Sequence, residues 1–338
     1  MAFATVFLES NASYSRSSES LLYKGETIKA INASLGCPET AVSDSTIGAV
    51  AMLMAIQSLD TKGEDLGLHS NALQTMIKMR GGIDMLGLDG ALKLFILWED
   101  LLCSSMAAEA PHYALTSFSL PGSSTLGYNS FVPGFDLPYE LYGGLSTIFR
   151  DIRQLTFAVN TQRQLSTAKD LMKLCGIRTA IEYQLLSLKY QRPGLETTDL
   201  DHHLEICRLA ALAYVQRALH VFLPAYAVIR SLKLQLISSF EEKERKSVNM
   251  VETSGPSILL WALFMGGILL SLDEEDEHWF AQRIARHVRA AGITTWAQME
   301  SWLRKVCWLD NLYTPTCKSL WQKVEDAVAE CRHAEAYL

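Results

Sequence analysis

Residues 69–100 read HSNALQTMIKMRGGIDMLGLDGALKLFILWED, and this stretch predicts the fold of the whole chain. Its first half places side chains at the spacing of one helix face, at His69, Leu73, Met76, Ile77 and Arg80. Gly81 and Gly82 end that helix, because glycine readily takes the left-handed conformation that closes a helix. Arg80 lies in the last turn, where a cation suits the negative end of the helix dipole. Arg80 is expected to be held by backbone carbonyls or by a carboxylate, with Asp84 and Asp100 as near candidates; the alternative is an exposed arginine.

A second helix is predicted to begin after Asp89, a good N-cap, and to run towards Cys103. It is apolar almost all round, at Leu92, Leu94, Phe95, Ile96, Leu97, Trp98, Leu101 and Leu102. A helix that is apolar on every side has to be buried between other helices. The two helices therefore predict a helical hairpin at the centre of an all-α core, and neither carries a catalytic constellation.

The rest of the chain repeats the helical pattern. Further helices are predicted over residues 21–35, 44–59, 145–165, 171–188, 199–224, after Pro224 to about residue 240, over 257–271, 272–291, 296–306 and from 315 onwards. We find no alternation typical of strands and no repeat of fixed period. The predicted fold is all-α, a multi-helix bundle of antiparallel helical hairpins in a single large domain with a long internal loop.

The predicted organisation has four parts. Residues 1–19 form a loose N-terminal segment, residues 20–110 an N-terminal helical part with the central hairpin, and residues 145–338 a C-terminal helical part packed on the first. Between them, residues 111–144 contain several prolines, glycines and serines without helical periodicity, which indicates a long loop. Such a loop is either a crossover on the surface or a segment that lines a ligand or partner site.

Several local signals make sharper predictions about the C-terminal part. Gly266 and Gly267, inside an apolar helix, would let a neighbouring helix approach closely. Ser271 is expected to cap the next helix, which has acidic residues in its first turns. Thr295 with Gln298 forms a capping box, and Pro315 suits the first turn of the last helix.

Composition excludes several classes of protein. The 338 residues are 49% hydrophobic and carry a net charge of −7; residues 1–110 hold 7 Lys/Arg against 13 Asp/Glu. No basic surface suited to a DNA backbone is evident. The seven scattered cysteines suit reduced thiols in an intracellular protein. No secretion signal is seen near the N-terminus, and the longest apolar run, about 15 residues, is shorter than the about 20 that a membrane span needs.

Two clusters invite a chemical interpretation. His203 and Cys207 lie four residues apart, as metal ligands on a helix can, but no second pair matches them, so solvated histidines at a helix start are the simpler reading. Asp273 and Asp276 resemble the aspartate-rich motif of all-α terpene synthases, which bind Mg²⁺ and diphosphate. The second metal-binding motif of those enzymes is not found, and acidic residues at a helix start need no ligand to explain them. We therefore expect no metal, no cofactor and no catalytic residue.

Taken in order, several motifs of the chain resemble the fungal-specific transcription factor domain, the helical regulatory region of fungal zinc-cluster transcription factors. The most specific motif is His69, Leu73, Met76, Arg80, Gly81, Gly82, Ile83, Leu86 and Gly87, followed by Trp98, Glu99 and Asp100. Trp261, Trp279 and Trp308 follow in the family's order, and the resemblance spans residues 20–330. The family's cluster of six cysteines beside a basic segment is not among these residues.

The resemblance implies a regulatory module that controls transcription in the nucleus and is not an enzyme. It would act through other transcription regulators or a DNA-binding partner, or through a small-molecule effector, with no direct DNA binding by this chain. The alternative is an all-α small-molecule enzyme of the terpene-synthase type, which two facing acidic clusters in one cavity would favour. The structural residues that carry the resemblance are His69, Arg80, Gly81, Gly82, Trp98, Asp100, Trp261, Trp279 and Trp308.

Overall fold

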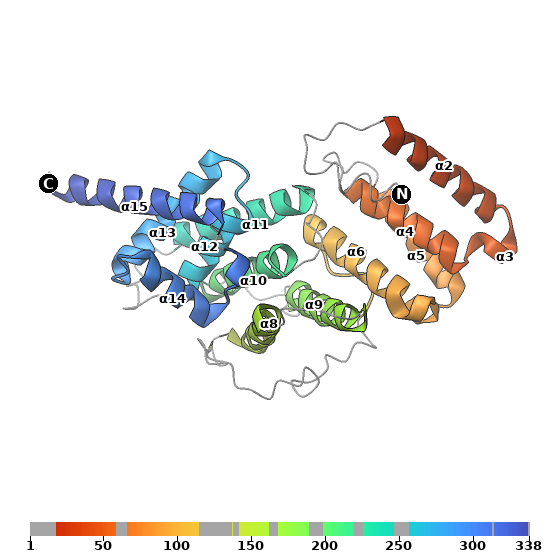
Figure 1. Ribbon diagram of the computed structural model, residues 1–338, viewed down its shortest axis with the longest axis horizontal. Coiled ribbons are helices and arrows are strands. Elements are labelled where there is room, and N and C mark those ends of the chain that lie inside the picture. Colours follow the sequence, from red (N-terminus) through yellow and green to blue (C-terminus); the bar gives the residue numbers. More distant parts are fainter. Residues whose placement is uncertain are drawn as a thin grey trace. The chain divides into compact units, whose positions relative to one another are not determined.

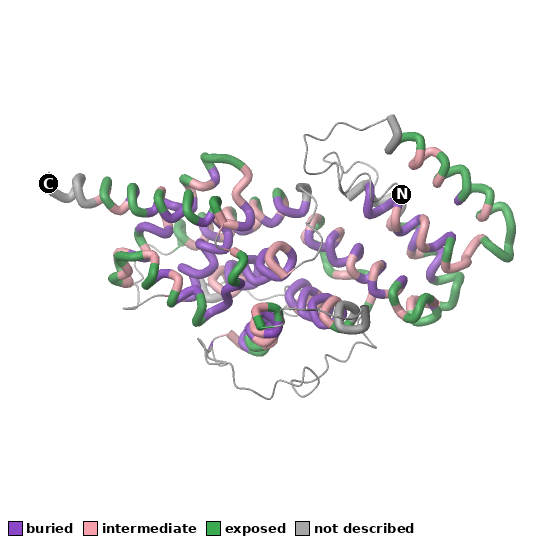
Figure 2. The backbone as a smooth tube through the Cα atoms, in the orientation of Figure 1, coloured by how far each residue is buried: buried purple, intermediate pink, exposed green. Residues whose placement is uncertain are grey.

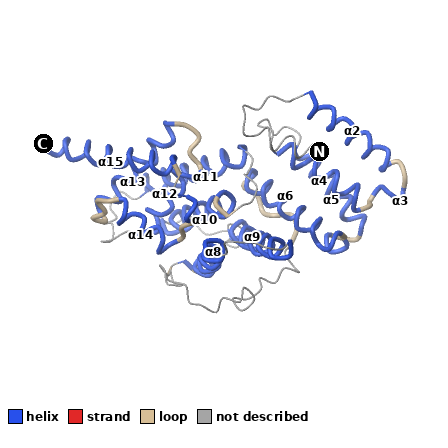
Figure 3. The backbone as a smooth tube through the Cα atoms, viewed as in Figure 1, coloured by secondary structure: helices blue, strands red, loops and turns tan. Residues whose placement is uncertain are grey.

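The computed structural model describes residues 18–58, 66–114, 137, 142–161, 168–188, 199–219, 226–246, 257–312 and 314–336. Within these ranges every regular element is a helix and none is a strand (Figures 1 and 3). The predicted all-α class is therefore confirmed. The chain forms two compact units: unit 1 comprises residues 1–104 with 225–227, and unit 2 comprises residues 105–224 with 228–338. No helix in the described ranges is both long and apolar enough to cross a membrane.

Unit 1 is built around a helix that packs against two neighbours. Its elements are α2 (Ser18–Leu35), α3 (Pro38–Ala41), α4 (Asp44–Ser58), α5 (Leu66–Arg80), η1 (Ile83–Met85), η2 (Leu88–Gly90) and α6 (Ala91–Ala107) up to residue 104. α4 contacts both α2 and α5. Its inner residues, among them Ile47, Ala51 and Met54, are almost completely buried. The first turn of α4 is capped by Ser43, whose Oγ accepts from the backbone N–H of Thr46 at 3.3 Å.

The helices predicted around residues 69–103 are present as α5 and α6. α5 makes its main helix contact with α4. The predicted N-cap at Asp89 is wrong, because α6 begins at Ala91 and Asp89 lies inside η2. Leu88, Asp89 and Gly90 all have positive φ, at 58°, 51° and 83°. Three successive left-handed residues turn the chain before the helix starts, so Asp89 cannot hold the extended conformation of an N-cap.

Unit 2 has two central helices, α10 (Asp199–Arg217) and α12 (Ile258–Leu269). α10 contacts α8 (Gly144–Thr161), α9 (Ala168–Leu188) and α12, while α12 also contacts α13 (Glu274–Ala290), α14 (Trp296–Val306) and α15 (Pro315–Ala336). Residues 206–216 and 258–267 are buried without interruption, and Figure 2 shows purple over much of the centre of unit 2. A helix buried on all sides is the expected result of an all-round apolar sequence.

The close approach predicted at Gly266 and Gly267 is present. A Cβ atom on Gly266 would lie 2.6 Å from the Phe280 ring and 2.8 Å from Leu236, and one on Gly267 would lie 2.6 Å from Leu320. Real Cβ contacts are not this short, so α11 (Tyr226–Lys246), α13 and α15 pack directly on the α12 backbone.

The helix ends in unit 2 follow the local signals in part. Thr295 and Gln298 form the predicted capping box, and Pro315 begins α15. The cap of α13 is Asp273, whose side chain accepts from Asp276 N–H at 2.9 Å, so the prediction of Ser271 is wrong. α10 ends at Arg217, before the predicted end at residue 224, and α11 continues to Lys246, beyond the predicted residue 240.

The predicted loop over residues 111–144 lies mostly outside the described residues.

Candidate functional site

The end of α5 has the geometry that its glycines predict. Gly82 N–H donates to the Ile77 carbonyl at 2.9 Å, and Gly81 N–H donates to the Lys78 carbonyl at 3.1 Å. This pair of bonds is the Schellman motif, and both glycines have positive φ, 102° and 111°. His69 lies within α5, but its side chain is outside the described residues. The motif therefore fixes where the chain leaves the helix.

Arg80 pairs with Asp44, at 3.6 Å between Nη2 and Oδ1, and not with Asp84 or Asp100. Asp84 pairs with Lys93 instead. Any side chain on Gly87 would overlap the Asp44 carboxylate, so the turn after α5 lies directly against this group. Asp44 thus joins the start of α4 to the end of α5 and to the following turn. Because Arg80 and Asp44 are both partly exposed to solvent, we expect this ion pair to contribute only tenths of a kcal/mol.

α6 carries the tripeptide Trp98, Glu99 and Asp100, and its middle residue has the most unusual environment. Glu99 is 1% exposed, and neither carboxylate oxygen has a hydrogen-bond partner in the described structure. Burial raises the pKa of Glu99 from 4.5 to about 8. The pKa of Cys103, one turn further along α6, is raised to about 12 by burial and by the two carboxylates. Trp98 and Asp100 are the residues that the sequence marks in this motif; it does not mark Glu99, because the isolation of that carboxyl appears only in three dimensions.

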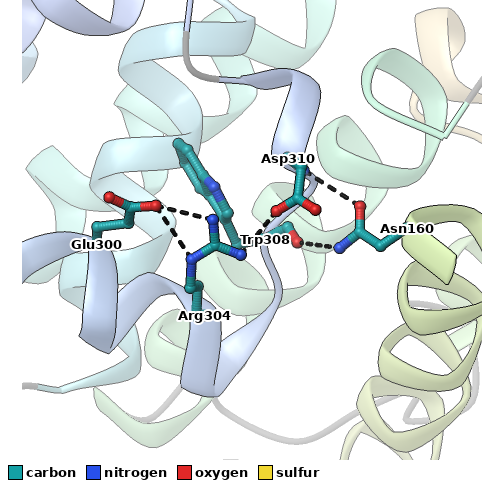
Figure 4. Close-up of polar contacts among 5 residues, drawn as sticks. All are labelled: Asn160, Glu300, Arg304, Trp308 and Asp310. Carbon is teal, nitrogen blue, oxygen red and sulfur yellow. Dashed lines mark hydrogen bonds and ion pairs between the residues drawn. The ribbon is translucent and has the colours of Figure 1, made fainter.

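In unit 2 the segment around Trp308 is held by side chains from distant parts of the chain. Asn160, at the end of α8, donates from Nδ2 to the Trp308 carbonyl at 3.0 Å, and its Oδ1 accepts from Asp310 N–H at 3.2 Å. Figure 4 shows the Arg304 guanidinium between the carboxylates of Glu300 and Asp310. Asp310 therefore joins the end of α14 to α8.

Behind this segment lies an aromatic cluster from four elements. The Trp261 indole donates to the Cys307 carbonyl at 2.8 Å. The Trp296 ring packs against Trp308 and Trp321, with centroids 6.1 and 5.7 Å apart in edge-to-face geometry. Phe264 contacts both Trp296 and Trp308. Edge-to-face pairs add to the free energy of burial. Trp308, chosen from the sequence, thus lies in one cluster with Phe264, Trp296 and Trp321. The ring of Trp261, also chosen from the sequence, packs on Phe149 and Tyr214 instead.

Trp279 lies apart from that cluster, on α13. Its ring packs on Phe240 and Phe280, and the Arg283 guanidinium lies 3.7 Å above its centroid. Such a cation–π contact is worth about 0.5–1 kcal/mol at an exposed site. Trp279 therefore covers the contact between α11 and α13.

The acidic start of α13 is accounted for by contacts within the chain. Asp273 caps the helix, and Asp276 binds Lys233 with distances of 2.8 and 2.7 Å to its two oxygens. Asp276 also accepts from Leu272 N–H at 2.8 Å. Neither carboxylate therefore requires a bound metal to explain its position.

His203 and Cys207 are likewise explained by contacts within the chain: His203 is hydrogen-bonded and Cys207 is buried. Tyr142 Oη lies 2.8 Å from His203 Nε2, and burial together with nearby Lys243 lowers the pKa of His203 to about 4. Cys207 is fully buried, and burial raises the pKa of its thiol far above the usual range. A protonated thiol is a poor metal ligand. Within the described ranges, no three His, Cys, Asp or Glu residues are grouped so as to hold a metal ion.

A buried polar network runs through unit 2 between α9, α10, α11 and the last residues of α6. Gln216 donates to Ser105 Oγ at 2.8 Å, and Gln235 donates to the Ser105 carbonyl at 3.1 Å. Glu182, which is 0% exposed, has Arg178 Nε at 3.2 Å, close enough for an ion pair but not aligned as a hydrogen bond. Burial raises the pKa of Glu182 to about 7, although Arg178 and Gln216 both act to lower it.

One pocket in unit 2 is lined by both apolar and polar groups. It has a volume of about 450 Å³ and lies between the end of α13, the turn after it and one face of α15. Its apolar lining includes Val288, Ile293, Trp321, Val324 and Val328, and its polar groups include Arg289, Thr294 and Glu325. This volume lies within the range of small-molecule sites.

The residues selected from the sequence do not converge on one centre. Arg80, Gly81, Gly82, Trp98 and Asp100 belong to unit 1, whereas the three tryptophans belong to unit 2. In each unit they close helices or fill the core. The arrangement supports packing within each unit.

Comparison with known proteins gives one match. The sequence profile of the fungal specific transcription factor domain matches residues 1–326. No curated protein matches the chain, and no solved structure matches it.

Proposed function

Because the chain belongs to the family of the fungal-specific transcription factor domain, we propose that it regulates transcription as an effector or interaction module that contains no DNA reader of its own. The observation that carries this proposal is the family match over residues 1–326, nearly the whole chain. A regulatory role follows from the family. The mode of action, through protein contacts or a small-molecule effector, is our inference.

Two features of the chain support the proposed mode of action. The net charge of −7 opposes binding to a polyanion, so a partner would have to read the DNA. The pocket at the end of α13 offers a place for a small effector. The nucleus is the location that this role requires, and other transcription regulators are the expected partners.

The direct test joins the full chain to a heterologous sequence-specific DNA-binding domain and measures a reporter gene that carries the matching site. We expect the fusion to change reporter transcription relative to the DNA-binding domain alone. Equal transcription from a fusion that is folded and located in nuclei would contradict the proposal. Affinity purification of the untethered chain from nuclei then asks which regulator brings it to a promoter.

A further inference from the structure

One helix of unit 1 exposes several large apolar side chains. α2 makes its main contacts with α4 and α3, and Ile31 is buried on its inner side. Four other apolar side chains of this helix are 40 to 60% exposed: Leu21, Leu22, Ile28 and Leu35. Figure 2 shows green along much of α2. Exposed apolar side chains that gather on one helix indicate a contact surface, whereas single ones need no explanation.

Three of these side chains form a row along one side of α2. Leu21, Ile28 and Leu35 are seven residues apart, which is close to two full turns of a helix. At 1.5 Å per residue the row is about 21 Å long. Gly25 lies beside the row, and no described atom lies within 4 Å of the position of an added Cβ there, so a second helix has room to approach. Apolar residues at seven-residue intervals are typical of helices that pack in pairs.

The row is symmetric about its middle residue. Because Ile28 lies seven residues from Leu21 and seven from Leu35, turning the helix end over end exchanges the two leucines and leaves the isoleucine in place. Two antiparallel copies of α2 would therefore place Leu21 against the partner's Leu35 and Ile28 against the partner's Ile28. A two-fold contact between identical chains requires a self-complementary surface of this kind.

The charges on the flank of the row also suit a second copy. Glu26 lies two residues before Ile28 and Lys29 one residue after it, and both are exposed. In the antiparallel arrangement the partner's Lys29 lies within one residue's rise of Glu26, so each copy can offer a cation to the carboxylate of the other. Exposed ion pairs add little affinity, but complementary charges help to fix the register of a contact.

We propose that α2 joins two copies of this chain in an antiparallel, two-fold contact centred on Ile28. A contact made by one pair of helices belongs to the class of small, transient interfaces, so the dimer is expected to form in the micromolar range of concentration. The inference goes beyond the proposed regulatory function, because the contact needs no other partner. A dimer would bring two copies of the module to one promoter.

Sedimentation equilibrium of the purified full chain over micromolar concentrations tests the contact. Ile28→Glu places two like charges at the two-fold axis and should weaken the dimer at least about tenfold. Leu234→Glu replaces a similarly exposed apolar side chain on α11 of unit 2, and this matched control should dimerise as the parent chain does. Thermal melts verify that each variant is folded. A parent chain that stays monomeric throughout this range, or an Ile28→Glu chain that dimerises as strongly as the parent, would overturn the proposal.

Cysteine cross-linking under mild oxidation tests the orientation. The exposed Cys37 is first replaced by serine, and this background chain is the blank. In it, Ile28→Cys should link two copies, because the two sulfurs meet at the axis. Leu21→Cys alone should give no linked dimer, whereas a mixture of Leu21→Cys and Leu35→Cys chains should give one. A Leu21→Cys chain that links to itself, with no linkage in Ile28→Cys, would refute the antiparallel contact.

The two proposals fail in different measurements. A chain that stays monomeric while its reporter fusion is active would refute the dimer and retain the regulatory function. A dimer that is lost in Ile28→Glu, together with a silent reporter fusion of the parent chain, would retain the contact and refute the function.

Discussion

At the scale of single residues, Glu99 makes the stability of the protein depend on pH. The folded protein keeps a proton on this carboxyl up to a pKa of about 8, whereas the unfolded chain releases it near the ordinary value of 4.5. The contribution to stability is therefore fully present below about pH 4.5 and is lost as the pH rises through 8. The pKa of Glu182 is raised to about 7, so this group also lowers the free energy of unfolding as the pH rises.

We predict that the free energy of unfolding falls between pH 5 and pH 8, with Glu99 contributing up to about 1.4 kcal/mol per pH unit. Glu99→Gln removes the titrating group and should flatten the dependence while leaving Glu182 in place. Urea titrations of both proteins at several pH values measure this. An unchanged slope in the variant would mean that Glu99 titrates near its ordinary pKa in the folded protein.

The glycines after α5 lead to a second prediction. Gly82 has a φ of 111°, and nothing lies within 4 Å of the position of an added Cβ. Gly82→Ala should therefore lower stability by about 1–2 kcal/mol through backbone strain alone. Gly25, in the middle of α2, has equally open surroundings but a helical conformation, so Gly25→Ala should raise stability by about 0.5–1 kcal/mol. Thermal and urea melts that show the same sign for both substitutions would disprove this account.

Residue-level predictions from the sequence succeeded where the cause was local. The closure of α5 and the Thr295–Gln298 box each depend on a few neighbouring residues. The prediction of Ser271 as the cap of α13 is wrong: Asp273 caps the helix, and Lys233, 43 residues away from Asp276, binds Asp276 and helps to set where α13 begins. Glu99 could not be recognised, since its burial depends on the packing of the folded chain.

At the scale of elements, the contact of α11 and α13 with α12 depends on Gly266. Gly266→Ala should lower stability by about 1–3 kcal/mol, because the new Cβ overlaps the buried Phe280 ring and Leu236. The gain of about 1 kcal/mol in helix propensity offsets this only in part. Gly48→Ala, inside α4, meets only an ordinary contact at 3.5 Å and should be neutral or stabilising.

A double-substitution cycle isolates the packing effect at Gly266. Phe280→Leu should cost less in the Gly266→Ala background than in the parent chain, because the smaller side chain relieves the overlap. Additive changes in the free energy of unfolding would show that the methyl group is accommodated elsewhere.

Most helices could be predicted because apolar side chains recur with helical period, which is a property of the sequence itself. Their ends were less predictable. α11 continues through its charged run because Glu242 pairs with Lys246 along the helix and Glu244 pairs with Arg283 of α13. The second of these pairs exists only after packing. The division into two units within α6 is likewise not visible in an apolar helix that continues across it.

At the scale of the whole molecule, charge leads to the last prediction. The chain carries 30 Lys and Arg against 37 Asp and Glu. Affinity for DNA depends on cations that neutralise phosphates and falls steeply with salt. We expect no sequence-selective complex with promoter fragments at about 150 mM salt in a fluorescence anisotropy titration. A selective complex that persists at that salt concentration would show that the folded chain gathers its cations on one face.

The function could be inferred from the sequence only through family resemblance, since no residue pattern names a reaction. The site could be predicted less well than the fold. The pocket combines Val288 and Arg289 with Trp321 and Glu325, and the sequence does not show that the end of α13 lies against the middle of α15. The tryptophan motifs did point to the aromatic cluster that supports it.

The bond between Asn160 and Trp308 joins residues 148 positions apart, and this separation has a consequence for the chain as it is made. Translation adds about 5–20 residues per second, so roughly 7–30 s pass between the emergence of the two partners from the ribosome. Throughout that interval Asn160 has neither the Trp308 carbonyl nor the Asp310 N–H that it binds in the folded chain. The end of α8 can therefore be joined to the segment after α14 only once residue 310 has been made, and a product terminated before residue 308 would lack this link.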